Sequence, residues 1–145
     1  MAEEKIYHLN FVGYWRDENK ANLPSISGVY LVYRCVYNIE GNTVSLKEII
    51  YIGQSYNIKN EFSSHAKANE FKETLLKGED LCYSCAFVER ADLDIVENAL
   101  IYAQEPPLNG VLKDNYNHDT ASFALTGKCK LMKHIKFRIT RGGND

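Results

Sequence analysis

The stretch SGVYLVYRCVYNIEGNTVSLKEIIYIG, residues 27–53, decides the fold that we expect. Residues 27–37 are rich in β-branched and aromatic side chains, and residues 44–53 return to the same composition, which is typical of strands. Between them lie Gly41 and Asn42, two residue types that tight turns favour. The stretch therefore predicts a β-hairpin whose two ends read GVY and YIG.

Helical patterns and a further strand follow the hairpin. From Asn57 the apolar residues recur four apart, which predicts a helix over 57–68, and residues 69–78 form a second helical piece. Residues 81–89 have the composition of a third strand. Residues 91–110 carry the clearest helical stripe, which ends at two consecutive prolines.

The two ends of the chain add weaker β signals. Residues 5–15 are strand-like, and two possible strands lie in the tail at 120–127 and 134–140. The order of elements predicts a compact α/β sandwich, in which helices flank a three-stranded, mostly antiparallel central sheet. In this prediction the tail is a small C-terminal β extension.

Length and charge limit what the chain can be. Its 145 residues are enough for one hydrophobic core, so we expect a single domain over residues 1–145. Seventeen Lys and Arg against 19 Asp and Glu give a net charge of −2, whereas proteins that bind nucleic acid usually present a basic surface. Residues 128–141 are locally basic, and the sequence leaves open whether they form a binding patch or an ordinary solvated face.

No apolar run approaches the roughly 18 residues that span a bilayer, so we expect no membrane partner. The acidic start of the chain lacks the apolar segment of a signal peptide, which favours a cytoplasmic protein. Cys82 and Cys85 have the spacing of a metal or redox pair, but they lie in a predicted strand. Residues three apart on a strand point to opposite faces, so we expect these thiols to be reduced and packed apart.

Three polar features stand out from this background. Tyr30 and Tyr51 lie on the two paired strands of the hairpin, each close to a glycine that permits close approach. Residues 61 and 65 share a face of the predicted helix, and Glu97 lies beside the apolar stripe of the last helix. Each feature alone has an ordinary explanation, namely packing for a tyrosine and solvent exposure for a histidine or glutamate.

Taken together, four blocks resemble the GIY-YIG nuclease family: GVY (28–30), YIG (51–53), QSYNIKNEFSSH (54–65) and VENALIYAQEPPLN (96–109). That family has an arginine eight residues after the YIG glycine and, in one branch, a histidine four residues later. A glutamate on a later helix and an asparagine after proline complete its pattern. The resemblance covers about residues 26–110, with 111–145 as an extension. It is nearest to small, restriction-endonuclease-like members, which suggests a role in restriction or defence.

The resemblance implies a role for each matching residue. Tyr30 and Tyr51 would flank the attacking water as general base or orienting groups, and His65 would hydrogen-bond the nucleophile or the scissile phosphate. Glu97 would bind Mg²⁺ or Mn²⁺. Asn109 would help to hold the strand backbone of the substrate, and Gly28 and Gly53 are the structural glycines of the two motifs. Lys59 and Lys67 are not part of the family pattern, but they are the nearest cations for binding the substrate phosphate.

Glu61 departs from the pattern, because it occupies the position of the family arginine. An arginine there neutralises the phosphate as charge develops, whereas a carboxylate adds repulsion. We therefore expect the chain to be inactive or nearly so. The sequence does not decide whether Glu61 is an engineered change or a natural loss of catalysis.

Three hypotheses remain at this stage. The first is a divalent-metal-dependent endonuclease that cuts double-stranded DNA, for which a homodimer would supply two active sites. The second is a catalytically silent GIY-YIG-derived module that binds nucleic acid or a protein. The third is a protein with a vestigial site, which is hard to reconcile with the retention of both tyrosines, His65, Glu97 and Asn109.

Overall fold

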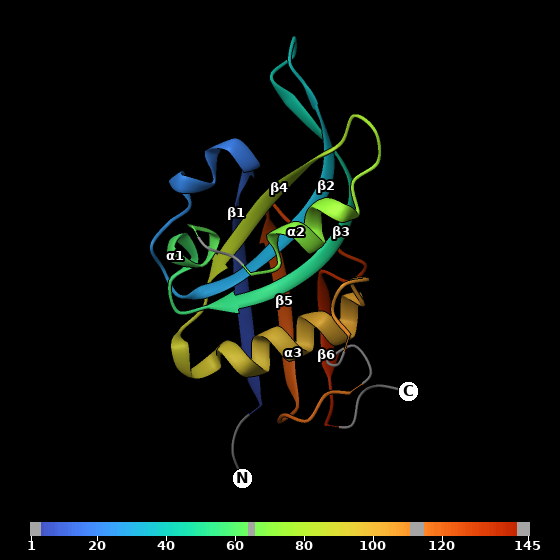
Figure 1. Cartoon of the computed structure of the whole chain (residues 1–145). Helices are drawn as coiled ribbons and strands as arrows, with labels where there is room; N and C mark the ends of the chain where they lie inside the picture. The colour runs from blue at the N-terminus through green and yellow to red at the C-terminus, as the bar shows by residue number, and fades with distance from the viewer. Residues whose placement is uncertain (1–3, 64–65, 111–114, 142–145) are drawn as a thin grey trace.

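A computed structural model describes residues 4–63, 66–110 and 115–141. Its strands form one six-stranded sheet with the order β3-β2-β4-β1-β5-β6 (Figure 1). β1 and β5 are parallel, whereas every other neighbouring pair is antiparallel. The strands are β1 (Lys5–Arg16), β2 (Gly28–Asn38), β3 (Thr43–Ser55), β4 (Asp80–Phe87), β5 (Ala121–Gly127) and β6 (Lys136–Ile139).

The helices are few and mostly short. Only α3 is longer than two turns, and none of the helices in the described part of the chain is long and apolar enough to cross a membrane. The helical segments are η1 (Asp17–Asn22), α1 (Ile58–Ser63), α2 (Ala68–Glu73), η2 (Arg90–Asp92) and α3 (Leu93–Gln104).

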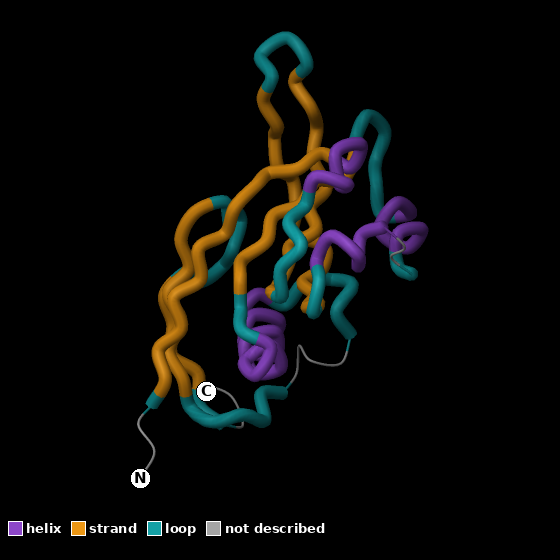
Figure 2. The backbone as a smooth tube through the Cα atoms, turned by 90° about the vertical axis from the view of Figure 1, so that its left-hand side faces the viewer, coloured by secondary structure: helices purple, strands orange, loops and turns teal. Residues whose placement is uncertain are grey.

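The sheet curls strongly into a half-barrel, and α3 lies within its hollow (Figure 2). The inner core joins α3 residues such as Leu100 to residues of all six strands, among them Leu31 and Phe123. The outer face of β2, β3 and β4 packs against α1 and α2 through a second core that contains Tyr30, Phe62 and Phe71. Two cores on the two faces of one sheet explain why the strands of the hairpin are apolar on both sides.

The predicted three-stranded sheet is wrong, because its strands β3, β2 and β4 are only half of the sheet. The segment predicted as an N-terminal strand is β1, which lies between β4 and β5. The tail strands join the same sheet through the parallel pairing of β1 with β5, from Lys5 beside Ala121 to Phe11 beside Gly127. They are therefore not a separate C-terminal extension. Partners so distant in sequence leave no local signal of their pairing.

Two local predictions are tested by the same structure. The hairpin is confirmed, with Asn42 in the left-handed conformation (φ 48°) at the turn between β2 and β3. The continuous helix over 57–68 is wrong, because α1 ends at Ser63 and α2 begins only at Ala68. Cys82 packs in the inner core and Cys85 in the outer core, which confirms that they point to opposite faces.

Candidate active site

Tyr30 lies on the outer face of β2, directly opposite Gly53 of β3. A Cβ atom added at Gly53 would lie 2.4 Å from the Tyr30 hydroxyl oxygen and 2.4 Å from its Cζ. The glycine therefore makes the space in which the Tyr30 ring lies. Phe62 of α1 packs edge-on against the same ring, with 4.8 Å between the ring centroids.

Tyr51 lies two residue pairs along the hairpin, opposite Val32 and on the same face as Tyr30, and the centroids of the two tyrosine rings are 6.2 Å apart. Its other neighbours are Phe71 of α2, at 5.1 Å between centroids, and Lys67, whose Nζ lies 5.4 Å from the ring centroid. Tyr51 is only partly buried, so its hydroxyl lies where the outer core meets solvent.

Both tyrosine hydroxyls are held in the neutral form. Burial raises the pKa of Tyr51 to about 12, and the carboxylates of Glu97 and Glu61 add to the rise. Burial also raises the pKa of Tyr30 well above its usual range, with further contributions from Tyr51 and Glu61. At neutral pH these phenols can orient a water molecule by hydrogen bonding, but neither is a phenolate that could take a proton from it.

Glu97 comes from the middle of α3 and is half-buried. The side-chain amide of Gln54, on β3, donates to its Oε1 at 3.1 Å and to Oδ1 of Asp94 at 2.8 Å. Burial raises the pKa of Glu97, which the Gln54 hydrogen bond opposes and the nearby Asp94 reinforces. The carboxylate is thus partly desolvated, a costly arrangement that is common at functional sites.

Residues after α3 close the edge of the sheet at β3. The backbone N–H of Leu108 donates to the carbonyl of Ile50 at 3.0 Å. The buried amide of Asn109 binds Ile52 twice, accepting from its N–H at 2.9 Å and donating to its carbonyl at 2.9 Å. Asn109 therefore satisfies edge groups that a neighbouring strand would otherwise pair. In this position it holds the strand that carries Tyr51, and its amide is engaged within the protein.

Replacing Asn109 with alanine is expected to lower the free energy of unfolding by about 2 to 4 kcal/mol, because two buried backbone groups of Ile52 lose their partner. Urea denaturation measures this change. The matched control is Asn69→Ala on the exposed side of α2, which should change stability by less than about 0.5 kcal/mol. Equal stabilities of the two variants would contradict a stabilising role for the hydrogen bonds between Asn109 and Ile52.

These elements surround a cavity of about 190 Å³ beside the β3 edge. The structure brings four residues of the predicted site to its wall, each from a different segment. The lining consists of Tyr51, Lys67, Glu97, Ile101, Leu108, Asn109 and Gly110. A phenol, an ammonium group and a desolvated carboxylate therefore lie around one open space.

The other predicted residues lie as follows. Glu61, in the first turn of α1, has its Oε2 3.5 Å from the Tyr30 hydroxyl, so it is close to the site. Lys59 is exposed on the same helix, and it does not line the cavity. Gly28 lets β4 approach, since a Cβ there would lie 2.1 Å from the Ala86 carbonyl oxygen. His65 lies outside the described residues.

Sequence reasoning missed Gln54 and Asp94, which fix the position of the Glu97 carboxylate. The spacing of Asp94 and Glu97, three apart on one helix, was an available signal. No sequence signal could have identified Gln54, because its contact with α3 depends on how the helix crosses β3.

Glu97→Gln is expected to stabilise the fold at neutral pH. The folded state holds a proton on Glu97 more tightly than the unfolded state does, because its folded-state pKa is raised. The free energy of unfolding of the unaltered chain therefore falls as pH rises from the ordinary glutamate pKa through the raised one. The glutamine variant lacks this loss, and it can still accept the Gln54 hydrogen bond.

Thermal melts of both proteins between pH 4 and pH 8 measure this effect. We expect the glutamine variant to melt a few degrees higher at the upper end of this range, because each kcal/mol of stability shifts the melting temperature by about 2 to 8 °C. The difference between the two proteins should shrink toward acid pH. A variant that is less stable at pH 8 would mean that Glu97 makes a structural contact.

The donor set bears on which metal the cavity could hold. Among the described residues no group of three or more His, Cys, Asp or Glu side chains forms a metal cage. A single carboxylate at the wall of an open cavity instead fits Mg²⁺ or Mn²⁺, ions that keep several waters and share substrate phosphate oxygens. Glu97 is the residue that would hold such an ion.

Comparison with models of known protein families, with curated proteins and with solved structures gives no match to this chain.

Proposed function

We propose that the chain is a divalent-metal-dependent DNA endonuclease of the GIY-YIG type, with its hydrolytic reaction suppressed by Glu61. The observation that supports this most is the cavity at the β3 edge, which Tyr51, Lys67 and Glu97 line together. Those residue types serve phosphodiester hydrolysis, which needs an oriented water, a metal ligand and a cation for the phosphate.

Each residue of the site has a separate role in the proposed reaction. The neutral hydroxyls of Tyr51 and Tyr30 orient the attacking water, and its proton passes to solvent, since the raised pKa values of both tyrosines prevent either from acting as the base. Glu97 would hold the Mg²⁺ or Mn²⁺ ion, which would supply stabilisation of negative charge on the leaving 3′ oxygen. Lys67, at the cavity wall, and Lys59, on the exposed side of α1, neutralise the backbone of double-stranded DNA.

Glu61 opposes this arrangement. Its carboxylate lies beside Tyr30 and raises the pKa of both tyrosines, so it adds negative charge where a phosphate would lie. The same observation favours a second candidate function, a module of this type that binds nucleic acid or a protein without cutting.

Both the suppressed endonuclease and the non-cutting nucleic-acid-binding module require that the unaltered chain binds DNA. The measurement is the affinity for a 20-base-pair duplex, by fluorescence anisotropy, over a range of salt concentrations. We expect log K to fall with log salt, and Lys59→Gln and Lys67→Gln each to reduce the slope by about 1. The matched control is Lys77→Gln in the exposed turn after α2, which should leave the slope unchanged.

A salt slope near zero would exclude DNA as the partner and leave the protein-binding form of the module or a vestigial site. A strong slope that neither lysine variant changes would place DNA on another surface, and would therefore contradict the proposed site.

A further inference from the structure

A larger cavity, of about 390 Å³, lies at the turn end of the β2–β3 hairpin, away from the candidate active site. Three segments that are distant in sequence line it: the end of β1 with η1, the hairpin arms, and β4 at Cys82. Its volume is in the range of small-molecule sites, roughly 300–1,000 Å³. No residue of the candidate active site lines it.

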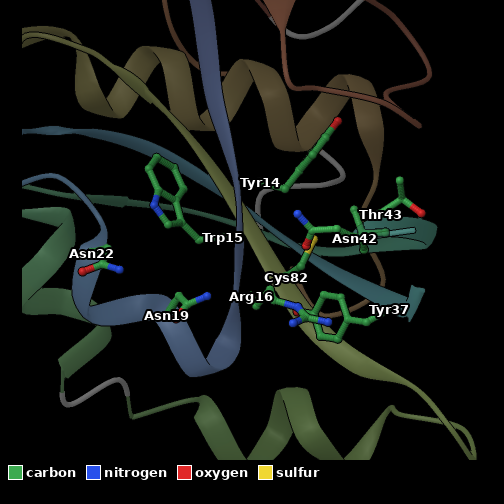
Figure 3. A pocket seen from close by; sticks show the side chains of 10 residues that line it. Tyr14, Trp15, Arg16, Asn19, Asn22, Tyr37, Asn42, Thr43 and Cys82 are labelled. Carbon is green, nitrogen blue, oxygen red and sulfur yellow. The ribbon is translucent and has the colours of Figure 1, made fainter. Parts of the chain in front are cut away.

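The centre of this wall is a stacked pair. The guanidinium carbon of Arg16 lies 4.0 Å from the centroid of the Tyr37 ring, and the Tyr37 hydroxyl donates to the carbonyl of Leu81 (Figure 3). That hydrogen bond fixes the ring, and the ring fixes the guanidinium plane. The Arg16 side chain remains 34% exposed, so Tyr37 does not cover it completely. The part of the guanidinium plane that Tyr37 leaves uncovered is a platform on which a second flat ring can stack.

Three asparagine side chains line the same cavity as the platform. Asn19 and Asn22 come from η1, and Asn42 comes from the turn between β2 and β3 (Figure 3). Within the described part of the chain, none of these three amides hydrogen-bonds to another protein group. Each offers two donors and one acceptor oxygen, the combination that pairs with the edge of a nucleobase.

The charges at this cavity are balanced. Arg16 pairs with Glu18 at 3.2 Å, and Lys20 lies 3.9 Å from Asp17. A ligand selected only by its negative charge, such as inorganic phosphate, would find little unmatched positive charge here. A planar ligand with a hydrogen-bonding edge fits the lining better.

We infer that this cavity binds the base of one nucleotide, stacked on the Arg16–Tyr37 pair and held at its edge by the asparagine amides. The nucleotide is either free or part of a single strand. Tyr37 lies seven residues along β2 from Tyr30 and on the opposite, inner face of the sheet, so this cavity is separate from the candidate active site.

The chain carries its own reporter for this test. Trp15 is its one tryptophan, and it lies in the wall of the cavity. Its fluorescence is followed while the four deoxynucleoside monophosphates, and separately an eight-residue oligothymidylate, are added to the unaltered chain without metal. Corrections for nucleotide absorbance come from a free tryptophan standard.

Three variants test whether the change in Trp15 fluorescence comes from binding at this cavity. Arg16→Lys keeps the charge and removes the flat platform, and we expect it to weaken binding about tenfold. Asn19→Ala, at an exposed position where truncation does not threaten folding, should weaken it several-fold. The matched control is Arg138→Lys on β6, at the far edge of the sheet, which should bind as the unaltered chain does.

Saturable binding that follows this order supports the inference, with a free nucleotide as the ligand if the monophosphates bind and a strand if only the oligonucleotide binds. No saturable change with any probe, or equal affinity in Arg16→Lys and Arg138→Lys, would overturn it. This outcome is separate from the nuclease proposal, because the titration involves neither metal nor cleavage.

Discussion

Replacing Glu61 with arginine is expected to raise the rate of DNA cleavage by at least about 100-fold, the typical size of one charge-stabilising contact in a transition state. The carboxylate lies 3.5 Å from the Tyr30 hydroxyl, next to the cavity that Glu97 lines. An arginine at this position would remove a repulsive charge and add a fork of donors for phosphate oxygens.

The rate is measured as nicking of supercoiled plasmid under single-turnover conditions with Mg²⁺. The matched control is Glu73→Arg at the end of α2, the same charge reversal at an exposed position. Activation by Glu61→Arg alone supports a specific role for that position. Equal activation by both variants would mean that overall charge limits DNA binding, and no activation by either would contradict a latent nuclease site.

Replacing Gly53 with alanine is expected to lower the free energy of unfolding by about 3 kcal/mol, at the upper end of what overpacking usually costs. The new methyl group would lie 2.4 Å from two atoms of Tyr30. That ring has no room to retreat, because it is only 1% exposed and packs against Phe62. The strands of the hairpin would have to separate, and Tyr30 would leave the site.

The control for this substitution is Gly41→Ala in the turn of the hairpin, where a Cβ would meet only Thr43 Oγ1 at 3.6 Å. We expect this variant to differ from the unaltered chain by less than about 1 kcal/mol in urea denaturation. If Gly53→Ala is as stable as Gly41→Ala, the Tyr30 ring does not occupy the space above Gly53.

The local elements of this fold could be predicted from sequence, whereas the sheet as a whole could not. The hairpin and α3 carry strong local signals, namely turn residues between apolar arms and an apolar stripe that ends at prolines. The parallel pairing of β1 with β5 joins strands more than a hundred residues apart, and nothing in either strand specifies the other. The error of a three-stranded sheet follows from that missing information.

The candidate site was predictable to a similar degree. The order of the motifs singled out Tyr51, Glu97 and Asn109, and Lys67 was named only as a nearby cation; all four line one cavity. Their chemical states were not predictable, because the raised pKa values of Tyr51 and Glu97 come mainly from burial between elements. The amide of Asn109 was expected to bind substrate, but in the structure it is engaged with Ile52.

The most direct measurement of the proposed function compares plasmid nicking by Glu61→Arg with nicking by Glu61→Arg/Glu97→Gln, each with Mg²⁺ and with a chelator. We predict metal-dependent nicking by the single variant and none by the double variant. Because Glu97→Gln is expected to stabilise the fold at neutral pH, unfolding would not account for the loss. Equal nicking by the two variants, or nicking that persists in chelator, would contradict Glu97 as the metal ligand and with it the proposed nuclease site.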